Sequence, residues 1–269
     1  MTTTLQTEFS VSSATSTSSS VLVPTQTLPV GRLVVVALAA ITIGDTAFTV
    51  TDSGGNAWTK AEAHGPTNNI DMVLAASILT TQLTTSSTIT LASSIGMSRS
   101  AAAAAVFLEP VTGPIPPLGT ILEGPSQVPV NAGSITTGSA TTNIVFGACG
   151  FVSSGRVLVP AAGWSAGTKS VPVTGTGLRA VQMVWREAAN ATAHANVGSI
   201  TDSGGTPTSG VMFAGLGYVA QSGGTPPVET GWTVGKAMVF DGALWQPTAG
   251  AFVSDGAGGW TEREIKVKT

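Results

Sequence analysis

The sequence contains an internal repeat. An apolar run at Leu33–Ile43 is followed by a turn-rich segment, a tryptophan and two further apolar runs, and the same series returns in the second half. Matched positions keep a nearly constant spacing, with 111 residues from Leu33 to Ile144 and 106 residues from Trp58 to Trp164. Two copies with so long a period indicate a duplicated domain, because solenoid and propeller repeats have periods of about 20–50 residues. Apolar strands, turns and a tryptophan recur, so the repeat predicts duplicated scaffold rather than a duplicated catalytic site.

Each copy has the composition of a β-protein. Charged residues make up only 9% of the chain, against about 25% in an average protein. Short runs rich in Thr, Val and Ala lie between turns formed by the 33 Gly and 15 Pro, which is typical of strands. The alanine-rich run Ala101–Ala105 is interpreted as a buried strand of small side chains. Strands at roughly ten-residue spacing, without helical segments between them, predict an all-β chain of two tandem jelly-roll-like β-sandwiches.

The expected domain boundaries follow the repeat. Gly113–Pro117 is rich in proline and should form an extended, semi-rigid linker. Trp58 and Trp164 are expected to cap one end of each sandwich core. Trp185 is expected to be a core residue in the second copy's equivalent of the Ile70–Leu79 strand. The predicted organisation is a first β-sandwich over residues 1–111, a linker over 112–119, a second β-sandwich over 120–220 and a C-terminal β-hairpin module over 221–269.

The C-terminal module contains a short repeat of its own. Val239–Trp245 contains Asp-Gly and ends on tryptophan, and Val253–Trp260 repeats this pattern. Asp-Gly between β-forming residues predicts a hairpin, because both central turn residues need positive φ. Exposed aromatic rings can also stack on sugars, so the candidate surface or glycan contacts are Trp232, Trp245 and Trp260. The alternative is that Trp245 and Trp260 pack across their own hairpins, and this interpretation is favoured.

One motif resembles the nucleophile region of chymotrypsin-like proteases. Asp-Ser-Gly-Gly occurs at Asp52–Gly55 and again at Asp202–Gly205. A nucleophilic serine needs a histidine base held by a carboxylate. The chain has only His64 and His194, and two copies of the motif do not suit one nucleophile. Both copies are therefore interpreted as tight turns, with an oxygen-ligand calcium site at either aspartate as the lesser alternative.

Other chemistry is not indicated by the sequence. Two histidines and the lone Cys149 give no zinc pattern, and no glycine-rich phosphate loop is followed by Lys-Ser or Lys-Thr. Cys149 lies in an apolar run and is expected to be a small buried hydrophobe. The 11 Lys and Arg residues are scattered, which argues against a nucleic-acid partner. We therefore expect no catalytic residue, no cofactor and no metal, and a chain that is not an enzyme.

The N-terminal region bears on where the protein is made. Met1–Ser20 is rich in Thr and Ser and has no positive charge, so no secretory signal peptide is expected. Leu33–Ile43 is well short of the ~20 apolar residues that span a bilayer. We expect synthesis in a cytoplasm without membrane insertion, and a role outside the cell only after release in a larger particle.

Several segments resemble virion proteins of tailed bacteriophages. The hairpin pattern of Val239–Trp245 resembles C-terminal modules of tail and minor structural proteins. Gly31–Val36 and Val50–Thr59 resemble the β-sandwich units of the same proteins, especially from phages of actinobacteria. The resemblance covers most of the chain, although its motifs are short and structural.

The resemblance implies a non-enzymatic virion structural protein, of the minor tail protein type, that assembles in the tail or tail tip and contacts the host surface. Its implied partners are other virion proteins and further copies of itself, with a homotrimer as the expected symmetry. Synthesis would take place in the host cytoplasm, with the virion as the final location. The alternatives are a capsid decoration protein that stabilises the head and an adhesin that binds a host cell-surface glycan.

Overall fold

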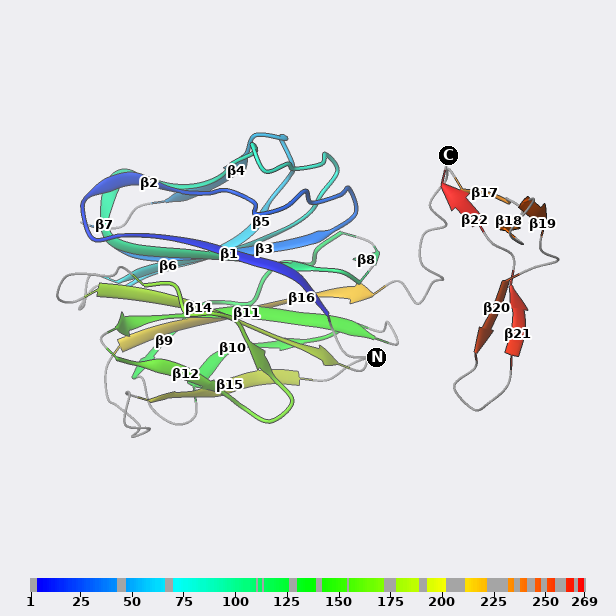
Figure 1. The fold of residues 1–269 in the computed structure, drawn as a ribbon. Helices are drawn as coiled ribbons and strands as arrows, with labels where there is room; N and C mark the ends of the chain where they lie inside the picture. The colour runs from blue at the N-terminus through cyan, green and yellow to red at the C-terminus, as the bar shows by residue number, and fades with distance from the viewer. Residues whose placement is uncertain are drawn as a thin grey trace. The chain divides into compact units, whose positions relative to one another are not determined.

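The computed structural model is all-β (Figure 1), so the predicted fold class is confirmed at that level. The residues that the structure describes are 4–42, 47–65, 70–109, 111–112, 114–125, 130–138, 142–153, 155–171, 178–188, 193–201, 211–221, 232–234, 238–240, 245–247, 251–254, 260–263 and 266–268. Within these ranges all strand pairs are antiparallel, and no helix is long and apolar enough to cross a membrane. The chain divides into two units, Met1–Gly223 and Gly224–Thr269.

The first copy of the repeat forms one seven-stranded sheet. Its strands are β1 (Leu5–Ser13), β2 (Thr17–Leu22), β3 (Leu33–Thr42), β4 (Phe48–Asp52), β5 (Thr59–His64), β6 (Asp71–Ile78) and β7 (Ile89–Phe107). They follow the order β1-β7-β3-β6-β5, and β2 and β4 also pair with β7. The first part of β7 pairs with β2 and β4, whereas its last part pairs with β1 and β3. Between the two parts, Gly96 and Arg99 have positive φ values of 85° and 49°, so the strand bends there.

The second copy forms two sheets. Its strands are β8 (Val111–Thr112), β9 (Leu122–Pro125), β10 (Val130–Thr136), β11 (Asn143–Ser153), β12 (Val157–Pro160), β13 (Ser165–Ala166), β14 (Leu178–Ala188), β15 (Ala193–Thr201) and β16 (Val211–Gln221). One sheet has the order β13-β14-β11-β16-β8, with β9 also paired to β16, and the other has the order β10-β15-β12.

The strand orders of the two copies match. The series β5-β6-β3-β7-β1 corresponds to β13-β14-β11-β16-β8, and the series β2-β7-β4 corresponds to β10-β15-β12. The chief difference is that β7 is continuous over 19 residues, whereas its counterpart consists of the two strands β15 and β16. The spacing found in the sequence therefore corresponds to a repeated set of strand pairings.

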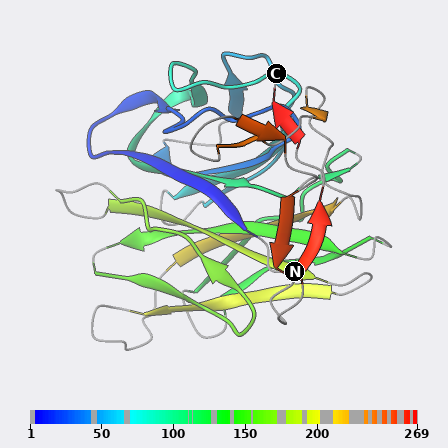
Figure 2. The same cartoon turned by 45° about the vertical axis from the view of Figure 1, so that its right-hand side comes forward.

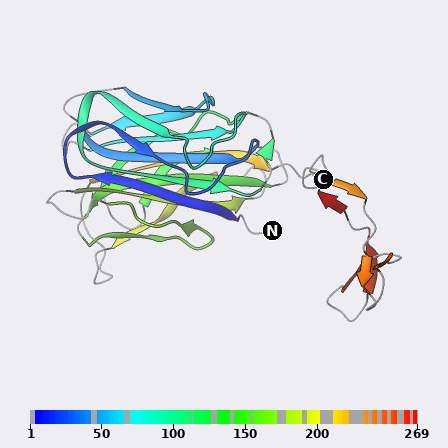
Figure 3. The ribbon, with the colours of Figure 1, turned by 45° about the horizontal axis from the view of Figure 1, so that its top comes forward.

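The strands of the first unit are stacked in four layers with three apolar cores between them (Figures 1–3). Strand β3 shows how the layers arise, because alternate side chains enter two different cores. Leu33 and Val35 face the core shared with the second copy, whereas Val34 and Val36 face the core beneath β2 and β4. A strand buried on both faces is expected to be continuously apolar, which explains the unbroken run from Leu33.

The middle core joins the two copies. It contains residues of β3, β6 and β7 from the first copy together with residues of β11 and β14 from the second. Phe107 contributes from β7 and lies edge-on to Trp185 of β14, with ring centroids 6.1 Å apart. The two copies therefore form one compact unit with a shared core. Their division at residues 112–119 into separately folding domains stays a prediction.

Several core assignments are confirmed. Ala101–Ala105 lies in β7 with all five side chains buried. Trp185 is buried in the shared core, and Trp164 is buried in the core of the second copy. Cys149 is completely buried, and burial raises the pKa of its thiol to about 12. Trp58 is only partly buried and packs against the edge of the core of the first copy.

The described residues of the C-terminal unit form three two-stranded ladders. Its strands are β17 (Trp232–Val234), β18 (Met238–Phe240), β19 (Trp245–Pro247), β20 (Ala251–Ser254), β21 (Trp260–Arg263) and β22 (Lys266–Lys268). The antiparallel pairs are β17 with β22, β18 with β19 and β20 with β21. The last two pairs flank the predicted Asp-Gly turns, which themselves lie outside the described residues.

Candidate functional site

The Asp-Ser-Gly-Gly motif of the first copy forms a hydrogen-bonded corner at the end of β4. The Asp52 Oδ1 atom accepts the Gly54 N–H at 2.7 Å, and Oδ2 accepts the Trp58 indole N–H, also at 2.7 Å. Gly55 has a φ of 70° and donates its N–H to the Asp52 carbonyl at 3.2 Å. A short acidic side chain and a glycine with positive φ are the residues that such a turn requires.

Asn56 extends the corner to the next strand connection. Its Oδ1 atom accepts the Thr80 and Thr81 N–H groups at 2.7 Å and 2.8 Å, and its Nδ2 atom donates to Asp52 Oδ1 at 3.1 Å. The Ser53 hydroxyl accepts the Thr88 N–H at 3.1 Å. The turn interpretation of Asp52–Gly55 is confirmed, since its polar groups bond to neighbouring backbone. The matching motif Asp202–Gly205 lies outside the described residues.

Replacing Asp52 with alanine is expected to lower the free energy of unfolding by about 2–3 kcal/mol, because several hydrogen bonds lose one acceptor and each contributes about 1 kcal/mol. Chemical denaturation monitored by tryptophan fluorescence would measure the change. Ser53→Ala removes only the bond to Thr88 and serves as the control, with an expected loss of about 1 kcal/mol. Equal losses in the two variants would contradict the central role of Asp52.

A second polar cluster lies between β5 and β6. His64 Nδ1 and Asp71 Oδ1 are 3.1 Å apart, and Asp71 is only 3% exposed. The other Asp71 oxygen accepts the Thr42 N–H at 3.1 Å and also the Thr42 hydroxyl. The His64 ring stacks on Phe48 with an interplanar angle of 7°. This histidine–carboxylate pair is engaged with the backbone of β3, and no hydrogen bond within the described residues joins it to Ser53.

A third cluster surrounds Trp164 in the second copy. The His194 ring lies edge-on to Trp164 at 6.3 Å, and the Arg186 guanidinium lies 5.6 Å from the centroid of the indole ring. The Nε2 atom of His194 is buried and has no hydrogen-bond partner within the described ranges. Burial, together with the nearby positive charge of Arg186, lowers the pKa of His194. The surroundings of His194 therefore disfavour its protonated form.

This lowered pKa predicts a pH dependence of stability. Below the unfolded value of 6.5 the unfolded chain binds a proton on His194 more readily than the folded chain does. The contribution of His194 is therefore complete above pH 6.5 and decreases as the pH falls toward the folded pKa. His194→Phe should show a smaller loss of melting temperature between pH 7 and pH 5 than the unaltered protein. Parallel pH profiles of the two proteins would contradict this assignment.

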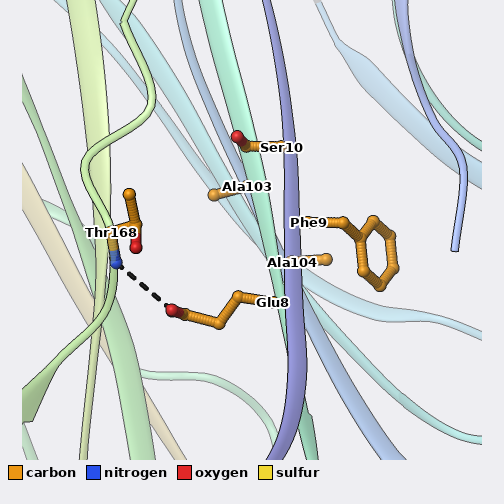
Figure 4. Close-up of a pocket in the computed structure, with 6 residues that line it drawn as sticks. All are labelled: Glu8, Phe9, Ser10, Ala103, Ala104 and Thr168. Atoms are coloured by element: carbon orange, nitrogen blue, oxygen red, sulfur yellow. Dashed lines mark hydrogen bonds between the residues drawn. The ribbon is translucent and has the colours of Figure 1, made fainter. Parts of the chain in front are cut away.

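A small cavity lies between the two copies of the repeat. It has a volume of about 180 Å³ and is lined by Glu8, Phe9, Ser10, Ala103, Ala104 and Thr168. Figure 4 shows the Glu8 side chain directed at Thr168, whereas the Phe9 ring lies on the opposite side of β1. Glu8 Oε2 accepts the Thr168 N–H at 3.3 Å. Burial raises the pKa of Glu8, and the hydrogen bond from Thr168 partly opposes that effect.

The three candidate tryptophans lie on three different ladders. Trp232 is in β17 opposite Lys268, Trp245 is in β19 opposite Phe240, and Trp260 is in β21 opposite Ser254. The strand pairings do not place them in one ladder. Their role as surface or glycan contacts stays a prediction. No pattern in the sequence predicts that Glu8 and Thr168 meet, because these residues are 160 positions apart and belong to no recognisable motif.

The described ranges contain no group of three or more His, Cys, Asp or Glu side chains arranged to hold a metal ion. Comparisons with known protein families, with curated proteins and with solved structures give no match for this chain.

Proposed function

We propose that the chain is a non-enzymatic structural protein of a tailed-bacteriophage virion, of the minor tail protein type. Two observations support the proposal. One is the resemblance of the hairpin and sandwich segments to phage virion proteins, and the other is the architecture of the two copies. The main structural support is that two copies with the same strand order pack across one apolar core and form a block of four β-layers.

The order of the strands supports a jelly-roll interpretation of each copy. If the two parts of β7 are counted as the seventh and eighth strands, one ladder of the first copy has the order 1-8-3-6-5 and the other has the order 2-7-4. The second copy repeats this order with β15 and β16 in the same places. Jelly rolls consist of two such interlocked Greek keys and occur in viral capsid and lectin domains.

The use of the polar residues also suits a scaffold. Asp52 and Asn56 bond a corner together, and Asp71 bonds β3 to β5. A virion protein must keep its shape outside the cell, and in this chain the lone cysteine allows no intramolecular disulfide. Burial on both faces of the middle layers supplies stability in place of a covalent cross-link.

Capsid decoration is the second candidate, because the jelly-roll order suits a head protein as well as a tail protein. Purified virions that encode the chain would be examined by mass spectrometry and by labelling with an antibody against residues 1–223. The tail proposal predicts that the chain is found in the particles and that the label lies on the tails. Label on the heads would favour decoration, and absence of the chain from the particles would overturn both candidates.

A further inference from the structure

The cavity between β1 and the β13–β14 connection is lined by the polar residues Glu8, Ser10 and Thr168. Their hydrogen-bonding groups are not all used by contacts within the described residues. Glu8 and Ser10 point to the same side of β1, because side chains alternate along a strand. Ala103 of β7 lies opposite Ser10 in the strand register, and its small side chain leaves the space open. Thr168 faces these residues from the second copy, and both Ser10 and Thr168 are exposed to solvent.

Glu8 introduces a negative charge that has no positively charged partner among the described residues. The ion pairs found within the described ranges join Lys60 to Glu62 and His64 to Asp71, and neither involves Glu8. The lysine next to Thr168 is turned elsewhere, since Lys169 Nζ donates to the Arg156 carbonyl at 2.6 Å. A half-buried carboxylate with one backbone donor keeps further hydrogen-bond capacity on its oxygens.

The Glu8 carboxylate packs closely against the backbone at Gly167. A Cβ atom added to Gly167 would lie 1.7 Å from Glu8 Oε1, so the absence of a side chain at Gly167 allows the carboxylate to lie there. The second contact between β1 and this connection is the hydrogen bond from the Ser170 hydroxyl to the Val11 carbonyl, at 3.2 Å. These two hydrogen bonds thus hold the wall opposite β1 in place, while the side facing solvent stays accessible.

We infer that this cavity is a binding site for a small primary ammonium compound that also carries hydroxyl groups, the class represented by amino sugars. The ammonium group donates to the Glu8 carboxylate, because a charge-assisted hydrogen bond compensates a half-buried negative charge. The hydroxyl groups of the ligand exchange hydrogen bonds with the Ser10 and Thr168 hydroxyls, each of which can donate and accept. The volume of about 180 Å³ limits the ligand to roughly one sugar ring.

The test is a titration of the full-length protein, observed by NMR with backbone amide labelling, with glucosamine, glucose and methylammonium in separate arms. Glucosamine should shift the Thr168 amide and saturate with a dissociation constant on the order of millimolar. Methylammonium should shift the same amide more weakly, and glucose should shift it least. Binding of glucosamine should weaken as the pH is lowered, since protonation of Glu8 removes the negative charge.

Glu8→Gln keeps the size of the side chain and should weaken glucosamine binding at least tenfold. Glu62→Gln is the matched control, because Glu62 already has Lys60 as its partner and lies away from the cavity lining. The control should bind as the unaltered protein does. Absence of saturable shifts, equal binding of glucose and glucosamine, or unchanged binding in Glu8→Gln would each overturn the site. None of these outcomes bears on the virion proposal, which is tested separately by looking for the chain in purified particles.

Discussion

Replacing Phe107 with alanine is expected to lower the free energy of unfolding by about 3–5 kcal/mol, the usual cost of removing a buried phenylalanine side chain. Phe107 is 1% exposed and lies in the core between the two copies. It pairs with Leu33 in the strand register and meets the edge of the Trp185 ring at 6.1 Å. The substitution therefore opens a cavity that both copies line. Denaturation in guanidinium chloride, followed by far-UV circular dichroism and tryptophan fluorescence, would measure the loss.

The same experiment tests whether the copies unfold together. A shared core predicts that both signals shift by the same amount and stay coincident, because a cooperative unit gives one transition with every probe. Val30→Ala is the control, since Val30 is 60% exposed and its removal should change stability by less than about 0.5 kcal/mol. Two separated transitions in Phe107→Ala, with only one of them shifted, would show that the copies are energetically independent sandwiches.

The fold class and the repeat could be predicted from the sequence because both depend on local patterns. The unbroken apolar run from Leu33 and the turn residues Asp52–Gly55 each determine nearby structure. Even the role of Asp52 follows from residues within six positions of it. These features need no knowledge of which strands meet in space.

The packing of one copy on the other could not be predicted in this way. Both faces of β3 are apolar, and nothing in the run shows that one face meets a sheet more than 100 residues away. The cavity could not be predicted for the same reason, because Glu8 and Thr168 come together only when the two copies pack against each other. Asp71 likewise begins an ordinary core strand, β6, and its partners come from β3 and β5. These contacts depend on pairing between strands that are distant in the sequence, and local secondary-structure propensity does not specify them.

Replacing Asp71 with alanine is expected to cost about 3–5 kcal/mol of stability, because removal of this buried carboxylate breaks its hydrogen bonds to Thr42 and its pairing with His64 at the same time. The Thr42 N–H would lose its acceptor, and His64 would lose its carboxylate. Asp71 also attracts the guanidinium of Arg179, which is 5% exposed. Burial and the nearby positive charge of Arg99 lower the pKa of Arg179 to about 10, and the negative charge of Asp71 partly opposes this shift. Without Asp71 the positive charge of Arg179 would be less well compensated.

Thermal and chemical denaturation of Asp71→Ala, His64→Ala and the double variant would separate these contributions. His64→Ala should cost less than Asp71→Ala, since it removes one of the bonds to Asp71 and leaves those from Thr42 intact. The double variant should cost less than the sum of the two single losses, because the two side chains share one interaction. If Asp71→Ala were no more destabilising than His64→Ala, the bonds from Thr42 and the attraction to Arg179 would contribute little, and the cluster would be a simple histidine–carboxylate pair.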